Sequence, residues 1–246
     1  MRNIKLTIEY DGTAYHGWQS QVNAATIQDV VNAAVNKLTG EVCTLYGSSR
    51  TDAGVHAYGQ VANFRTASGI PSDRFAFALN TLLPQDIVIV KSEEADPSFH
   101  ARFCARGKKY RYLFYNSMFP SALLKNRAWI VHFPLNVDAM REASGYFLGT
   151  HDFLAFSSSG GSVKTTVRTI NSINIGRENR PHVLSLDIEG NGFLYNMVRI
   201  IAGTLVEVGY GKMMPGEIKD ILESRDRRLA GPTAPPQGLY LVEVIY

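Results

Sequence analysis

The sequence predicts an α+β fold in which two βαββαβ units follow one another along 246 residues and share a mainly antiparallel central sheet. Three observations favour this fold. Several short segments alternate apolar with polar residues, as half-buried strands do. Between them lie stretches whose apolar residues recur at helical spacing and whose ends carry capping residues. The order of segments in the first half recurs in the second, without a Pro/Gly/Ser-rich linker between the halves.

The first unit is expected over residues 1–104. Its opening strand runs from Ile4 to Tyr10, where apolar and polar residues alternate. Thr26 is expected to cap the helix that follows, with Asp29 three residues later as a variant of the capping box, and Gly40 is expected to end it. The remaining elements are strands over 42–46 and 58–64, a short helix over 72–82 and a strand over 87–90.

The second unit is expected over residues 105–246 and repeats the same order. It begins with an aromatic-rich strand over 108–115, and Asn136 is expected to open the next helix. The later elements are strands over 165–175 and 183–188, a long apolar helix over 193–208, a helix over 217–223 and a closing strand over 239–245. Each unit therefore has the element order of a ferredoxin-like domain.

Composition excludes several classes of protein. Hydrophobic residues make up 45% of the chain, too many for a largely disordered protein. No apolar run approaches the ~20 residues of a membrane helix, and the opening MRNIKLTIEY does not resemble a signal or transit peptide. Cys43 and Cys104 are too few for a disulfide framework or a cysteine metal site. We therefore expect no membrane association and a cytoplasmic location.

Charge is distributed unevenly, although the net charge of +3 is too small to identify a nucleic-acid-binding protein. No acidic residue lies between Asp96 and Asp138, a stretch rich in cations and aromatic rings. Its cations are Arg102, Arg106, Lys108, Lys109, Arg111, Lys125 and Arg127. Cations contact phosphates and aromatic rings stack on unpaired bases, so this stretch suits RNA. An ordinary solvated face beside core aromatics has the same composition, so composition alone does not decide.

A lone carboxylate lies in the segment SSRTDAGVHAY, between two predicted strands. Asp52 is the only acidic residue between Glu41 and Asp73. The Ala and Gly that follow it allow a substrate to approach the backbone closely. Asp and Gly are also common in tight turns, so the segment is either a catalytic loop or simply a turn.

A lone cation lies in the long apolar helix. Arg199 is surrounded by apolar residues, so we expect it to be at least partly buried. No acidic residue lies between Glu189 and Glu207, and no helical neighbour can therefore neutralise it. A buried guanidinium needs a partner, which must be a ligand phosphate or a carboxylate from elsewhere, for which Asp52 is the candidate. The alternative is a guanidinium that extends to solvent along a buried stem.

The strand GKKYRY places Lys108, Tyr110 and Tyr112 on one face and Lys109 and Arg111 on the other. Tyrosines beside cations suit base stacking, whereas tyrosines packed in the core would hydrogen-bond through their hydroxyls. Other chemistries have little support. The sequence contains no Walker loop, dinucleotide fingerprint or HExxH motif, its histidines lack ligand spacing, and no nucleophile-elbow pattern is present.

The segment SSRTDAGVHAYGQVANF resembles the signature of the tRNA pseudouridine synthase A family, whose usual form reads GRTDAGVHA. Other matching segments extend the resemblance over essentially the whole chain: YDGTAYHGWQSQ at 10–21, FHARFCARGKKYRY at 99–112, GTHDFLAF at 149–156, TVRTI at 166–170, NGFLYNMVRIIAGTLVEVGYGK at 191–212 and TAPPQGLYL at 233–241. One departure is Ser49, which replaces the glycine before the signature arginine. A serine is tolerated there if its φ is negative.

The resemblance implies the pseudouridine synthase fold and an isomerase that converts uridine to pseudouridine in the anticodon arm of tRNA, at or near conventional positions 38 to 40. It implies no cofactor, no metal and a homodimer that holds RNA across both subunits. Asp52 matches the family's catalytic aspartate, Arg199 the arginine that pairs with it, and Tyr110 the active-site tyrosine. Arg50 matches the arginine that assists RNA engagement and base flipping.

Charge and chemistry extend these expectations. We expect Arg106 and Lys108, with Arg102 and Lys109, to line the tRNA-binding groove of the dimer. The aspartate could attack C1′, add to C6 of the base or abstract a C2′ proton, and the sequence does not choose. Two rival classes are a non-catalytic RNA-binding protein, which leaves the isolated Asp and Arg unexplained, and a base-modifying hydrolase, for which zinc ligands are missing.

Overall fold

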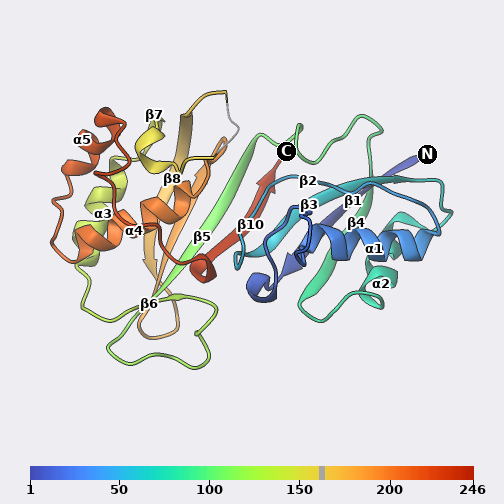
Figure 1. The fold of residues 1–246 in the computed structure, drawn as a ribbon, viewed down its shortest axis with the longest axis horizontal. Helices are drawn as coiled ribbons and strands as arrows, with labels where there is room; N and C mark the ends of the chain where they lie inside the picture. The colour runs from blue at the N-terminus through green and yellow to red at the C-terminus, as the bar shows by residue number, and fades with distance from the viewer. Residues whose placement is uncertain (161–163) are drawn as a thin grey trace. The chain divides into compact units, whose positions relative to one another are not determined.

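The computed structural model describes residues 1–160 and 164–246, which form two compact units. Figure 1 shows the elements of each unit. Unit 1 comprises Met1–Arg106 together with Tyr240–Tyr246, and unit 2 comprises Gly107–Leu239.

The closing strand differs from the sequence-based expectation, which placed residues 239–245 in the second unit. Residues Tyr240 and Leu241 pair in parallel with His56 and Ala57. This pairing, together with the hydrogen bond that the Arg106 amide donates to the carbonyl of Ile245 at 2.8 Å, makes the end of the chain part of unit 1.

Unit 1 is a sheet in the order β4-β1-β3-β10, with α1 and α2 packed on one face (Figure 1). β1 is antiparallel to both β3 and β4, and a short β2 also pairs antiparallel with β3. The elements are β1 (Arg2–Tyr10), α1 (Ile27–Thr39), β2 (Tyr46–Gly47), β3 (His56–Thr66), α2 (Phe75–Asn80), β4 (Ile87–Ala95) and β10 (Leu239–Ile245). The order before β10 is the predicted βαββαβ.

The capping residues of α1 confirm the prediction. Thr26 Oγ1 accepts the amide of Asp29 at 3.3 Å and donates to its carboxylate at 2.6 Å. Gly40 adopts a left-handed φ of 71° and ends the helix. The predicted strand over 42–46 is wrong except at its end. The amides of Cys43 and Leu45 donate to side-chain oxygens of Asn36 and Asn32 on α1, which leaves them unavailable to a neighbouring strand.

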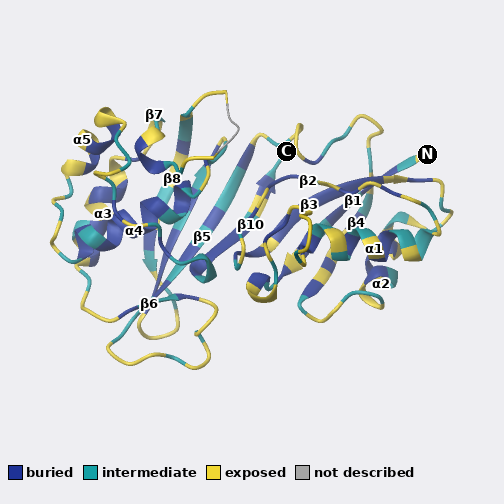
Figure 2. Cartoon of the chain, viewed as in Figure 1, coloured by how far each residue is buried: buried dark blue, intermediate teal, exposed yellow. Residues whose placement is uncertain are grey.

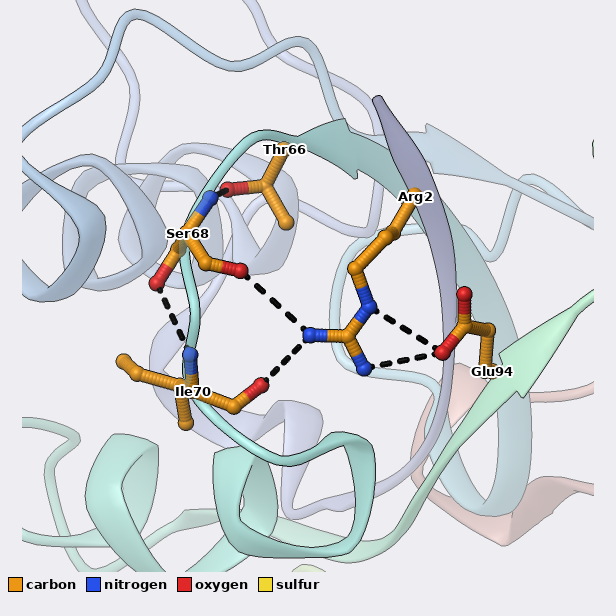
Figure 3. Close-up of polar contacts among 5 residues, drawn as sticks. All are labelled: Arg2, Thr66, Ser68, Ile70 and Glu94. Carbon is orange, nitrogen blue, oxygen red and sulfur yellow. Dashed lines mark hydrogen bonds and ion pairs between the residues drawn. The ribbon is translucent and has the colours of Figure 1, made fainter.

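The edge of the unit 1 sheet is fastened by Arg2 (Figure 3). Its guanidinium donates to Glu94 on β4 at 3.0 and 2.8 Å, and to the carbonyls of Ser68 and Ile70 at 3.3 and 2.8 Å. The amide of Ser68 in turn donates to Thr66 Oγ1 at 3.0 Å. One side chain therefore joins β1, β4 and the connection that follows β3.

Unit 2 is a sheet in the antiparallel order β5-β9-β8-β7, with a short β6 parallel to β5. The elements are β5 (Gly107–Asn116), β6 (Trp129–Val131), α3 (Val137–Gly145), β7 (Gly149–Asp152), β8 (Val167–Arg177), β9 (Val183–Gly190), α4 (Met197–Gly209) and α5 (Glu217–Ser224). Asn136 caps α3 as predicted, by accepting the amide of Ala139 at 3.1 Å.

Helix α4 forms much of the unit 2 core, and Figure 2 shows it largely in the colour of buried residues. It begins at Met197, four residues later than predicted. Asn196 has a left-handed φ of 61°, a conformation that cannot continue a right-handed helix toward the N-terminus. Both units contain mainly antiparallel sheets with helices, which confirms the predicted α+β class. Within the described residues, no helix combines the length and the hydropathy needed to cross a membrane.

Candidate active site

Asp52 lies half-buried in the loop that joins β2 to β3, which we call the signature loop (residues 48–55). The residue before it is anchored at two atoms. The Thr51 hydroxyl lies 2.7 Å from the Tyr10 hydroxyl in a buried hydrogen bond, and the Thr51 carbonyl accepts the amide of Trp18 at 3.1 Å. The Asp52 carbonyl accepts the amide of Val55 at 3.1 Å and closes a turn. The turn interpretation was therefore correct as geometry, and it does not exclude a catalytic role.

Glycines allow the segment 10–21 to pack directly against the signature loop. A Cβ on Gly17 would lie 2.3 Å from the Thr51 carbonyl oxygen, and one on Gly12 would lie 2.0 Å from that of Val55. Gly17 also has a φ of +86°, which L side chains rarely adopt. These contacts give a physical reason for the glycines of YDGTAYHGWQSQ, because only a residue without Cβ lets the two backbones approach so closely.

The start of the signature loop is fixed by Gln60 on β3. Its amide nitrogen donates to the Ser49 carbonyl at 2.8 Å, and its Oε1 accepts the Ser48 hydroxyl at 2.7 Å. Among the described non-glycine residues, those with positive φ are Asn23, His182, Asn196 and Arg225. Ser49 is not one of them, so the condition under which a serine is tolerated here is met.

The predicted RNA-contacting cations differ in exposure. Arg50, directly before Thr51, is exposed, as is Arg106 at the end of the first part of unit 1. Lys108 is half-buried on β5, opposite Gly190 of β9. Arg50 and Arg106 are therefore accessible to a ligand.

Arg199 is half-buried near the start of α4, as predicted. Its Nε donates to the Ala234 carbonyl at 2.8 Å, and its Nη1 donates to Asn196 Oδ1 at 2.8 Å. The side-chain Nδ2 of Asn196 in turn donates to Ser158 Oγ at 2.9 Å. Both acceptors are neutral, so they orient the guanidinium without neutralising its charge. Sequence reasoning missed Asn196 and Ala234 as orienting groups, although Asn196 stands three residues before the arginine.

Tyr110 and Tyr112 lie on the same face of β5, as predicted, and both are buried. The Tyr110 ring makes an edge-to-face contact with Phe193 at 5.1 Å between ring centres. Tyr112 is fully buried, its hydroxyl donates to the Pro235 carbonyl at 2.7 Å, and burial raises its pKa well above the ordinary value. The core interpretation is therefore correct for Tyr112. Arg111 on the other face forms a bidentate ion pair with Asp187, with donor–acceptor distances of 2.8 and 3.0 Å.

The structure thus places Asp52, Arg50 and Arg106 in unit 1, and Tyr110, Lys108 and Arg199 in unit 2. Within the described residues, His, Cys, Asp and Glu side chains form no cluster of three or more that could bind a metal ion.

Comparisons with known proteins agree on one family. The family model described as tRNA pseudouridine synthase matches residues 6–104 and 143–246. Proteins named tRNA pseudouridine synthase A from Acetivibrio thermocellus, Ruminiclostridium cellulolyticum and a Thermoanaerobacter species are 61%, 57% and 51% identical to this chain. Each match covers 100% of both chains. Because the model matches well over half of the chain and the relatives match along its entire length, the chain belongs to the tRNA pseudouridine synthase family and, within it, to the synthase A group.

Proposed function

We propose that this protein isomerises uridine to pseudouridine in tRNA, at or near conventional positions 38 to 40 of the anticodon arm. One observation carries the proposal. The lone carboxylate of the family signature, Asp52, is half-exposed on a loop whose backbone is held before it, at Thr51 and by Gln60, and is closed into a turn after it by the Val55 amide. A reactive group must be held rigidly and still be reachable, and this loop meets both conditions.

The chemistry assigns a role to each residue. The N1–C1′ bond breaks, the uracil turns, and a C5–C1′ bond forms. C5 then loses its proton, and N1 gains one. Asp52 starts the reaction at C1′, at C6 or at the C2′ proton, and in each case acts as a carboxylate. Arg199 serves as its counter-ion. Tyr110 stacks on the base or relays a proton, and Arg50 engages the RNA as the uridine is flipped, which costs roughly a few kcal/mol.

Pseudouridine mapping on an unmodified tRNA transcript tests this function. The transcript is incubated with the protein in the presence of EDTA, first with the wild type and then with Asp52→Asn, which keeps the shape and removes the charge. We expect wild-type modification at 38 to 40, no product with Asp52→Asn and nearly unchanged tRNA affinity. Asp73→Asn is the matched control, because that carboxylate is exposed and forms its ion pair with the neighbouring Arg74 at 3.6 Å. Turnover by Asp52→Asn, or loss of wild-type activity in EDTA, contradicts the assignment.

We also propose that the enzyme works in the cytoplasm as a homodimer, with tRNA contacted by the acid-free segment around Arg106 and Lys108. Cys43 and Cys104 are free, in keeping with a reducing compartment. Replacing Arg106 and Lys108 with Gln should weaken tRNA binding and flatten the slope of log K against log salt by ~0.7–0.9 for each phosphate that the variant no longer binds. An unchanged slope indicates that the RNA binds elsewhere. If light scattering shows that the protein is a monomer under conditions in which it is active, the homodimer is excluded.

A further inference from the structure

Unit 1 carries an exposed group of rings that none of the assigned roles uses. Tyr46, on β2, is 44% exposed, and Phe103 is 75% exposed. The His100 ring lies between them, with ring centres 5.0 Å from Tyr46 and 4.4 Å from Phe103. The Arg102 guanidinium lies 5.7 Å from the centre of the Phe103 ring. We call Tyr46, His100, Arg102 and Phe103 the aromatic platform.

The platform stands on a rigid support of buried asparagines. Asn63, the register partner of Tyr46 on β3, accepts the amide of Ala101 at 2.8 Å. Asn3 on β1 donates to the Phe99 carbonyl at 2.9 Å, and Asn63 donates to the Asn3 side chain at 2.9 Å. Both asparagines are almost completely buried. The segment that carries His100 and Phe103 is therefore held in place before any partner binds, which lowers the entropy cost of binding.

The local backbone also fixes the histidine. His100 Nδ1 accepts the amide of Arg102 at 3.1 Å, and the His100 carbonyl accepts the amide of Cys104 at 3.0 Å. With Nδ1 used as an acceptor, the neutral ring carries its proton on Nε2. The platform thus combines two exposed rings, a hydrogen-bond donor and a cation.

Charge favours RNA over protein as the partner. The two segments that build the platform, 42–51 and 97–106, contain Arg50, Arg102 and Arg106 and no acidic residue. Exposed rings grouped together mark a binding site more often than rings scattered singly. Rings interleaved with arginines are typical of surfaces on which unpaired bases stack and phosphates are held. Tyr46 is also only four residues before Arg50, the residue proposed to engage the RNA as the uridine is flipped.

We infer that the aromatic platform binds an unpaired nucleotide of the tRNA anticodon loop, one that does not itself react, by stacking its base on Phe103 with Arg102 beside its phosphate. The inference rests on the proposed function, because that function supplies the tRNA. The platform would be a second binding site for the RNA, separate from the site that holds the uridine to be isomerised.

Phe103→Ala tests the platform. Its affinity for an unmodified tRNA transcript is measured by filter binding at several salt concentrations, beside the wild type. Stacking of one base contributes about 1–3 kcal/mol, so we expect Kd to rise about 5- to 150-fold. The Phe103→Tyr variant should bind tRNA as tightly as the wild type. The Phe103→Leu variant, which is apolar but has no ring, should bind as weakly as Phe103→Ala. The slope against salt should be unchanged in Phe103→Ala and flatter in Arg102→Gln.

Phe77→Ala is the matched control. Phe77 is 68% exposed and lies under a cation, with Arg74 at 5.6 Å, but it belongs to α2 and has Asp73 nearby. Its Kd should equal that of the wild type. The platform proposal is overturned if Phe103→Ala binds tRNA as tightly as Phe77→Ala. It is also overturned if Phe103→Leu binds tRNA as tightly as the wild type. A Phe103→Ala variant that binds tRNA normally but changes its mass in light scattering shows instead that the face contacts protein.

The outcome for the platform is separable from the outcome for the activity. If the wild-type protein binds the transcript and forms no pseudouridine, the proposed function fails while the stacking contact can still be measured. If the wild type forms pseudouridine and Phe103→Ala binds as tightly as the wild type, the function stands and the platform is rejected.

Discussion

The two charged residues assigned to the reaction are held in contrasting ways. Asp52 is positioned through backbone: the carbonyl and hydroxyl of its neighbour Thr51 are bonded, and Gly17 brings a second chain segment against the loop. Arg199 is positioned through its own side chain, which donates to Asn196 Oδ1 and to the Ala234 carbonyl. A short carboxylate has few rotamers, so holding its backbone narrows the positions that its oxygens can take. A long guanidinium also needs acceptors at its tip.

This contrast predicts which substitutions are damaging in each unit. Around Asp52, the sensitive positions are those where a Cβ would push the backbone. Around Arg199, they are those that supply an acceptor. Neither set carries a catalytic group, so both are positioning residues.

The largest effect is expected from Gly17→Ala. The new methyl would lie 2.3 Å from the Thr51 carbonyl oxygen, so the signature loop must move. A displacement of about 1 Å at a reacting group reduces turnover by about 100-fold. The left-handed φ of +86° adds a stability cost of ~1–2 kcal/mol. Pseudouridine formation at saturating tRNA and thermal unfolding measure the two effects.

Gly40→Ala separates backbone strain from displacement of the loop. Gly40 also has a left-handed φ, +71°, but nothing lies within 4 Å of the position that a Cβ would take there. The variant should lose ~1–2 kcal/mol of stability and keep its activity. If Gly40→Ala loses as much activity as Gly17→Ala, the close approach to Thr51 is not what positions Asp52.

A smaller effect is expected from Asn196→Gly. Glycine keeps the left-handed conformation that starts α4 but removes the oxygen that accepts from Arg199. A hydrogen bond to a charged group contributes ~1.5–3 kcal/mol, so kcat should fall at least tenfold. Asn23→Gly is the control, because Asn23 has the same φ of 61° and is exposed. Unchanged kcat in Asn196→Gly shows that the Asn196 oxygen is not what orients the guanidinium.

The smallest effect concerns Glu41, which fastens the end of β3 opposite to the signature loop. Its carboxylate accepts the Thr66 hydroxyl at 2.8 Å and the Ala67 amide at 3.1 Å, and these bonds lower its pKa below the ordinary 4.5. The contribution to stability is therefore present above pH 4.5 and is lost as the pH falls through the folded-state pKa. Glu41→Gln should lower Tm slightly near pH 7, and the difference should vanish in acid. A difference in Tm that does not shrink as the pH is lowered below 4.5 contradicts the carboxylate's role, and activity should be unaffected.

Local rules predicted much of the fold. Alternation identified β1, and the Thr26 and Gly40 signals located both ends of α1, because strand faces and helix caps depend on neighbours in sequence. The predictions failed where residues distant in the sequence determine the local structure. Residues 42–45 resemble a strand, but the α1 asparagines take the amides of Cys43 and Leu45. The start of α4 is set by the left-handed Asn196, which apolar periodicity cannot reveal.

The site shows the same division. The isolation of Asp52 and Arg199 from other charges could be read directly from the chain. Their supports could not: Ala234 lies 35 residues from Arg199 and contributes only a carbonyl, a group that every residue has. The glycines at 12 and 17 were visible as part of a motif, but their reason, contact with the backbone of the signature loop, required the structure.

The placement of β10 has a consequence for how the protein is made on the ribosome. Tyr240 stacks between His56 and Tyr58, at 4.7 and 5.0 Å between ring centres, and the Tyr246 hydroxyl donates to the Ala101 carbonyl at 2.8 Å. The N-terminal unit therefore finishes folding only after all of Gly107–Leu239 has been translated. Until then the start of β3, at His56 and Ala57, lacks its β10 partner, and an exposed strand edge of this kind is a surface that nascent chains and chaperones bind.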